Sequence, residues 1–179
     1  VDRAASLLER MSVDEIVDLI QIMPSKDAQE IIVRLSPSGT AQKVKRILEY
    51  DEDTAGGVMT PDFVSVDPDM TVENVIDKIK QVSERFHSIQ YVYVTDAKEK
   101  FLGVISLRKL IVADRTKKAK ETMRGHKKLP TVTAERSLLS VARKMTKYNL
   151  YSIAVLGPNH RLLGVITVDD IMRRLLPHA

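Results

Sequence analysis

The stretch Phe101-Leu102-Gly103-Val104-Ile105-Ser106 returns later in the chain as Leu162-Leu163-Gly164-Val165-Ile166-Thr167. In both copies apolar residues surround a glycine at the third position, and a hydroxyl residue that can cap a helix stands last. Each stretch therefore predicts a β-strand that runs directly into a helix, at 107–113 in the first copy and 168–176 in the second. Such self-similarity indicates an internal duplication.

The residues that precede the two strands repeat as well. The corresponding segments are 58–60 with 122–124, a strand at 64–66 with one at 130–132, the helices capped by Thr71 and Ser137, and a strand at 91–94 with one at 153–156. Each copy thus has the order β-α-β-β-α, and we place the copies at 58–116 and 117–179. We expect the two sheets to pack together about a pseudo-two-fold axis.

Residues 1–50 have helical rather than strand periodicity. Ser12-Val13-Asp14-Glu15 is a capping-box sequence, and Pro24 ends the helix that follows. Two further helices, predicted to start near Ser25 and at Ser36-Pro37, would complete antiparallel hairpins. About fifty residues bury little apolar surface alone, so we expect this region to pack on other helices or on the repeats. An acidic, flexible connection at 51–57 completes an α+β chain.

The composition is that of a globular protein, with 44% hydrophobic and 29% charged residues. The chain has no cysteine, which excludes disulfides and thiolate chemistry and is consistent with a reducing compartment. No window approaches the ~20 consecutive apolar residues of a membrane span, so we expect the fragment itself to be soluble. Because it begins at Val1 within a helical pattern, we expect it to be a piece of a longer protein.

The formal net charge is +4, and much of the excess lies in one basic run. That run comprises Arg115, Lys117, Lys118, Lys120, Arg124, Lys127 and Lys128. We interpret it as a solvated linker between the repeats. With three phenylalanines and five tyrosines in the chain, an aromatic stacking platform is not expected, and no nucleic-acid partner is predicted.

The β-α-β-β-α order, with a glycine-containing strand that ends in Ser or Thr at a helix N-terminus, resembles a tandem pair of CBS domains. Residues 50–61, Tyr50-Asp51-Glu52-Asp53-Thr54-Ala55-Gly56-Gly57-Val58-Met59-Thr60-Pro61, follow the helical hairpins. Together with residues 106–114 they are similar to the cytosolic part of MgtE-type magnesium transporters. This resemblance implies a homodimer formed through the CBS pair and a transmembrane pore domain in the same longer protein. It also implies a place on the cytoplasmic face of the cell membrane, where the region closes the pore in response to intracellular magnesium or another divalent cation.

Candidate metal ligands follow from this resemblance. Magnesium prefers hard oxygen ligands, and the i,i+4 spacing of Asp14 and Asp18 places both on one helix face. The resemblance implies that they face the CBS pair and that Asp170 is a third ligand. Helix-dipole complementarity explains Asp14 equally well, and capping explains Asp170. The family's remaining acidic positions fall on Ser137, Leu139, Asn149 and Arg173, so the usual magnesium geometry is incomplete.

CBS pairs also hold adenosine nucleotides, and the resemblance implies ATP or AMP as a ligand. Thr167 and Asp170 have the spacing of a phosphate-binding hydroxyl and a ribose-binding acid. In the first copy Ser106 is followed by Lys109 where the acid would stand. Tyr91 matches a position near adenine and Arg108 one near phosphate, although a packed strand residue and a surface helix residue are equally good interpretations.

No pattern in the sequence predicts catalysis. The four histidines are scattered without partners at metal-ligand spacing, and Gly56-Gly57 lacks the lysine and strand of a phosphate loop. We therefore expect a regulatory region and not an enzyme. The alternatives to a cation-responsive transporter region are an adenine-nucleotide sensor and a purely structural dimerisation platform.

Overall fold

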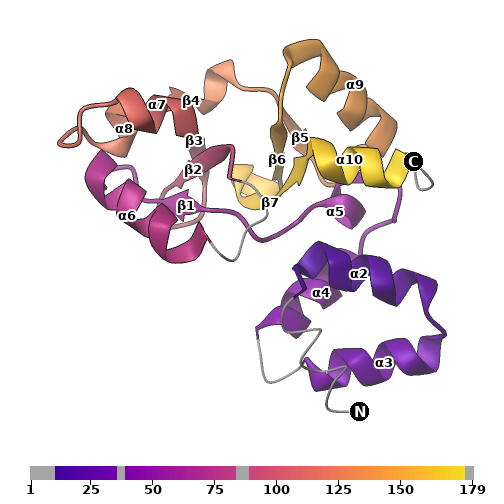
Figure 1. Ribbon diagram of the computed structural model, residues 1–179. Coiled ribbons are helices and arrows are strands. Elements are labelled where there is room, and N and C mark those ends of the chain that lie inside the picture. The colour runs from indigo at the N-terminus through magenta and orange to yellow at the C-terminus, as the bar shows by residue number, and fades with distance from the viewer. Residues whose placement is uncertain (1–10, 36–38, 84–88, 176–179) are drawn as a thin grey trace.

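The computed structural model describes residues 11–35, 39–83 and 89–175 (Figure 1). Its N-terminal part contains the helices α2 (Val13–Ile22), α3 (Ser25–Arg34) and α4 (Thr40–Leu48). The carboxylate of Glu15 accepts a hydrogen bond from the backbone N–H of Ser12 at 2.8 Å, as a capping box requires. The predicted cap of the third helix, Ser36-Pro37, lies outside the described residues.

The two repeats have the predicted β-α-β-β-α order. The first contains β1 (Ser65–Val66), α6 (Val72–Val82), β2 (Tyr91–Thr95), β3 (Phe101–Ser106) and α7 (Leu107–Val112). The second contains β5 (Thr131–Thr133), α9 (Leu138–Tyr148), β6 (Ser152–Leu156), β7 (Leu162–Thr167) and α10 (Val168–Leu175). The remaining short elements are α5 (Ala55–Val58), α8 (Ala119–Thr122), β4 (Arg124–Gly125) and the 3₁₀ turns η2 (His126–Lys128) and η3 (Pro158–His160).

The two sheets have matching topology. In each, the first strand pairs in parallel with the second and the second antiparallel with the third, giving the orders β1-β2-β3-β4 and β5-β6-β7. The registers also match, with Tyr91 opposite Ser106 and Ser152 opposite Thr167. Side chains from the two sheets share one core, whose buried members are Tyr93, Phe101, Ala154, Leu156, Leu162 and Val165. The sheets therefore face each other, as the duplication predicts.

Each repeat also pairs with a short backbone segment from the start of the other repeat. Thr60 exchanges two backbone hydrogen bonds with Val165 of β7, at 2.8 and 2.9 Å, and Arg124 of β4 pairs with Val104 of β3. A Cβ atom at Gly164 would lie 2.8 Å from the carbonyl oxygen of Thr60, and one at Gly103 would overlap the carbonyl oxygen of Arg124. The two repeated glycines thus leave room for these paired segments.

The predicted flexible connection at 51–57 needs a correction. Residues 55–57 belong to the short helix α5 and are buried. The backbone N–H of Ala55 donates to the carbonyl of Arg136, and that of Gly56 to the carbonyl of Ala134, both at 2.8 Å. Because these residues are small, the turn can approach the second repeat closely. The segment is therefore a docked turn, not an open linker.

One continuous core joins the helical region to the second repeat. It includes Val17 and Ile47 from the helices, Ala55 from α5, and Val141 and Ile166 from the second repeat. The first repeat has a separate core between its sheet and helices. Figure 1 accordingly shows α2, α3 and α4 below the second repeat, away from the first. No helix in the described parts of the chain has the length and apolar character needed to cross a membrane.

Candidate functional site

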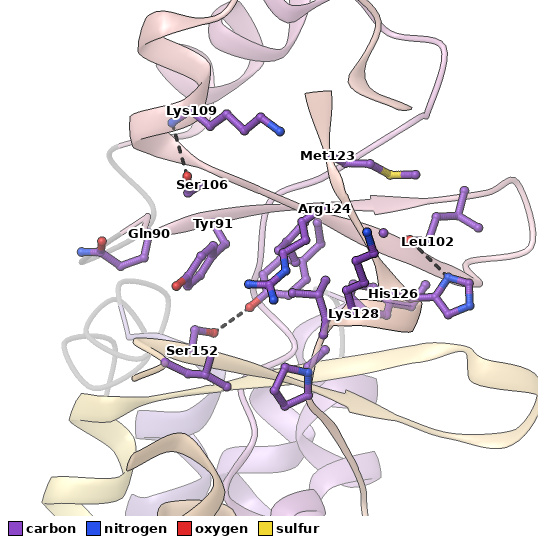
Figure 2. Close-up of a pocket in the computed structure, with 18 of the residues that line it drawn as sticks. Gln90, Tyr91, Leu102, Ser106, Lys109, Met123, Arg124, His126, Lys128 and Ser152 are labelled. Atoms are coloured by element: carbon purple, nitrogen blue, oxygen red, sulfur yellow. Dashed lines mark hydrogen bonds between the residues drawn. The ribbon is translucent and has the colours of Figure 1, made fainter. Parts of the chain in front are cut away.

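A cleft of 1290 Å³ lies between the two repeats. Figure 2 shows Tyr91, Arg124, Lys128 and Ser152 around this space, with the first sheet on one side and the second sheet on the other. Tyr91 comes from β2, Arg124 and Lys128 from the segment that joins the repeats, and Ser152 from β6. The site therefore exists only because the two repeats pack together.

The cleft has a basic wall. The positively charged side chains that line it are Arg108, Lys109, Lys120, Arg124, Lys127 and Lys128. Among the described residues that line it there is no carboxylate. A concave surface with charge of one sign concentrates ions of the opposite sign, and Arg and Lys bind phosphate oxygens well. The cleft thus suits a multiply charged anion.

Part of the cleft lining is aromatic and neutral. Tyr91, Tyr93 and Phe101 line it, and the Tyr93 hydroxyl lies 2.6 Å from the Ser152 hydroxyl. Burial raises the pKa of Tyr93 above its ordinary value, so the ring stays a neutral hydrogen-bonding group at physiological pH. Tyr93 and Phe101 are buried, whereas Tyr91 is half-buried, so a planar, apolar ligand group could pack against Tyr91.

Helix α7 begins at the cleft and has Lys109, not an acid, at the position expected for a ribose-binding carboxylate. The backbone N–H of Lys109 donates to the Ser106 hydroxyl at 3.3 Å, and the Lys109 side chain is a cation lining the cleft. In the second repeat Thr167 and Asp170 occupy the equivalent positions. The two repeats therefore present opposite charges at the same place in the fold.

A second cavity of only 110 Å³ adjoins Thr167 and Asp170. The Asp170 carboxylate accepts hydrogen bonds from the backbone N–H and the hydroxyl of Thr167, both at 2.7 Å. Burial raises the pKa of Asp170 despite these hydrogen bonds. The acid and the hydroxyl are thus satisfied by each other, as in a helix cap, and the cavity is far smaller than a nucleotide site of about 300 Å³ or more.

The predicted metal ligands Asp14 and Asp18 lie opposite arginines. Arg173 on α10 is 3.5 Å from the Asp14 carboxylate and 3.9 Å from that of Asp18, and Arg174 is 3.8 Å from Asp18. Burial raises the pKa of Asp18, an effect that the two arginines oppose. Within 11–35, 39–83 and 89–175 no three His, Cys, Asp or Glu side chains form a group that could hold a metal ion. Magnesium therefore does not fit here, because guanidinium groups already neutralise the carboxylates.

Family models match almost the whole chain. A CBS domain model matches residues 55–115 and again 121–177, and the MgtE intracellular N domain model matches residues 1–53. A crystal structure of the cytosolic domain of the Mg²⁺ channel MgtE in complex with ATP has a TM-score of 0.89 and 35% identity, and covers 96% of this chain and 69% of its own. The soluble part of a magnesium transporter gives a TM-score of 0.90 at 32% identity, covering 98% and 68%.

The chain belongs to the MgtE family. Among its curated relatives, the magnesium transporter MgtE of Thermus thermophilus is 36% identical over 164 residues, which are 90% of this chain and 36% of the relative. MgtE of Enterococcus faecalis is 33% identical over 135 residues, 75% of this chain and 29% of the relative. The chain thus spans about a third of the length of these MgtE proteins.

The structure brings four of the six predicted site residues of this MgtE-family fold to the small cavity, which Asp14, Tyr91, Thr167 and Asp170 line together. Tyr91 also lines the large cleft, together with Arg108. Asp14 and Asp18 face the arginines of α10. Sequence reasoning missed four residues: Arg124, Lys128, Ser152 and Arg174. The basic run contains two of them and was predicted to be a solvated linker, but its members Lys120, Arg124, Lys127 and Lys128 line the cleft.

Proposed function

We propose that this chain is the cytosolic regulatory region of a membrane magnesium or other divalent-cation transporter. Membership in the MgtE family and the likeness to the MgtE cytosolic domain support this role. The chain would lie at the cytoplasmic face of the membrane and act on the pore domain of the same longer protein. Its role would be regulatory and not catalytic.

The ligand we propose for the large cleft is ATP. The basic wall supplies charges for a polyphosphate, and the half-buried Tyr91 supplies an aromatic surface for a purine ring. The cleft, at 1290 Å³, is larger than the usual small-molecule site of about 300–1,000 Å³, so it has room for a whole nucleotide. The related MgtE cytosolic domain that was crystallised with ATP supports the same assignment.

The chemistry of the cleft favours the phosphates over the ribose. Because Lys109 stands where an acid would accept the ribose hydroxyls, the sugar lacks that anchor. Each added phosphate instead gains charge-assisted hydrogen bonds to the basic wall. The affinity should therefore rise from AMP to ATP. The smaller cavity could take a phosphate or sugar group only if Thr167 and Asp170 separate.

Calorimetry with ATP tests this assignment. Replacing Arg124→Gln together with Lys128→Gln removes two positive charges from the cleft, and ATP affinity should fall by about tenfold or more. Lys45→Gln, which removes an exposed charge on α4, is the matched control and should leave affinity unchanged. Equal ATP affinities in all three proteins would contradict the assignment.

Regulation of the pore by intracellular cation, which the resemblance implies, would need a cation site other than Asp14, Asp18 and Asp170. We infer that nucleotide binding is the regulatory input. In the transporter that carries this chain, magnesium uptake should then depend on cytosolic ATP, and Arg124→Gln with Lys128→Gln should remove that dependence. A purely structural platform would show neither ATP binding nor this dependence.

We also propose a homodimer through the CBS pair. The equivalent helices α7 and α10 both expose apolar side chains, including Ile111 (67% exposed), Val112 (78%) and Met172 (50%). Clusters of exposed apolar side chains on a soluble domain favour a protein interface. In a symmetric dimer, the same contact would occur twice, once for each protomer, and would bury both α7 and α10.

A further inference from the structure

The last helix of the second repeat reaches the helical region through two arginines. Arg173 contacts Asp14 and Asp18 of α2, whereas Arg174 contacts Asp18 and also Glu52, at 3.8 and 3.1 Å. The Arg174 guanidinium also donates to the side-chain oxygen of Gln21 at 3.3 Å. Side chains from three separate segments therefore meet at one group of charges.

This group is partly shielded from solvent. The Asp14 side chain is 16% exposed and that of Arg174 is 27% exposed, whereas those of Asp18, Arg173 and Glu52 are 45%, 50% and 61% exposed. Exposed single ion pairs contribute little, but networks of several charges with reduced solvent contact contribute more. The apolar core that joins the helical region to the second repeat lies beside it through Val13 and Ile171. The charges thus lie beside the interface between the helical region and the second repeat, which we call the seam.

Either a divalent cation or these two arginines could neutralise the carboxylates that meet here. Three carboxylates, from Asp14, Asp18 and Glu52, would repel one another if no positive charge lay between them. Magnesium requires several oxygen ligands at about 2.1 Å in near-octahedral order. Here two guanidinium groups with fixed donor geometry supply the positive charge instead. A bound cation would have to displace or repel both of them.

We propose that Arg173 and Arg174 replace a divalent cation as the link between the helical region and the second repeat. Docking of the helical region in this chain then requires no magnesium. This inference rests on the proposed regulatory role, since it concerns how one part of the regulatory region is held on another. Its consequence is a helical region that stays docked when magnesium is withdrawn and that loosens with rising ionic strength.

Energy transfer between two dyes on the 179-residue chain measures this docking. The chain has no cysteine, so Gln29→Cys on α3 and Lys147→Cys on α9, both exposed positions, place one label on each side of the seam. Transfer is measured with and without millimolar magnesium at constant ionic strength. We expect the same transfer efficiency in both conditions for the chain with its native arginines.

The variants then test the arginines directly. Arg173→Gln with Arg174→Gln should lower the transfer efficiency in magnesium-free buffer, whereas Arg143→Gln, an exposed arginine of α9, should not. Circular dichroism confirms that each variant is folded. Two results would overturn the proposal: a rise in transfer on adding magnesium to the native sequence, or an unchanged transfer in the double variant. Neither readout involves ATP or transport, so failure here is distinct from failure of the proposed function.

Discussion

Gly103 and Gly164 lie at equivalent places in β3 and β7, each close to a backbone carbonyl of the segment that pairs with its strand. For Gly103 that carbonyl belongs to Arg124, and for Gly164 it belongs to Thr60. A side chain at either glycine would displace the paired segment and break its backbone hydrogen bonds to the strand. The lack of a side chain at these glycines therefore allows the close backbone pairing that joins the two repeats.

Replacing Gly103→Ala should lower the free energy of unfolding by about 1–3 kcal/mol, because the added methyl group overlaps backbone that cannot move aside cheaply. Urea denaturation measures the change. The control is Gly39→Ala, because a Cβ at Gly39 would have no atom within 4 Å. Equal stability of the two variants would show that the paired segment is not held as described.

Asp69 gives a pH prediction. Hydrogen bonds from Lys120 and Lys118 lower the pKa of Asp69 to about 2, from an ordinary value of 3.8. The unfolded chain therefore binds a proton at Asp69 before the folded chain does, so the stability this group contributes is present above pH 3.8 and disappears as the pH falls toward 2. In denaturation experiments across that range, the stability difference between the native sequence and Asp69→Asn should shrink. A difference that is constant with pH would refute the ion pairs.

The repeated glycines can be recognised in the sequence, but the backbone segments that pack against them cannot. Gly103 and Gly164 stand out because the surrounding pattern repeats, and repetition is visible without a structure. What lies opposite each glycine comes from distant residues. The arginines of α10 show the same limit, because Arg173 could be recognised as a missing acid, yet its contact with Asp14 depends on how the helical region packs.

At the scale of elements, periodicity predicted the helices and strands that have apolar faces. It failed for α5, since Ala55, Gly56 and Gly57 have no large side chain to form a pattern. Their burial depends on carbonyl groups at Ala134 and Arg136 that accept their backbone N–H groups. Small residues in a buried turn and small residues in a loose linker look alike until the opposite surface is known.

The exposed faces of α7 and α10 carry an element-scale prediction. Ile111→Asp places a charge in the proposed dimer contact, where burying it without a partner is unfavourable, so light scattering should show the monomer mass at concentrations where the native sequence is a dimer. The matched control is Val33→Asp, at an exposed position of α3 (69%), which should leave the mass unchanged. A variant Ile111→Asp that still dimerises would place the interface elsewhere.

At the scale of the whole molecule, a symmetrical fold carries asymmetrical sites. The duplication creates two equivalent spaces between the repeats, but one is a cleft of 1290 Å³ and the other a cavity of 110 Å³. The helical region contributes Asp14 to the smaller one, next to Arg173 of α10, whereas the basic segment lines the larger one. The sequence placed the hydroxyl and acid of a nucleotide site at Thr167 and Asp170, whereas the larger space lies on the side of Lys109. The size of each space could not be predicted, because it depends on where the helical region docks.

The affinity of the 179-residue chain for ATP relative to AMP tests the proposed function most directly. Calorimetry at one fixed ionic strength measures both constants in the same protein. Six basic side chains line the cleft, of which Lys120 is paired with Asp69, and no carboxylate among its described residues is offered to the ribose. ATP should therefore bind at least about tenfold more tightly than AMP. Equal affinities for the two nucleotides, or no binding of ATP, would contradict this assignment of the cleft.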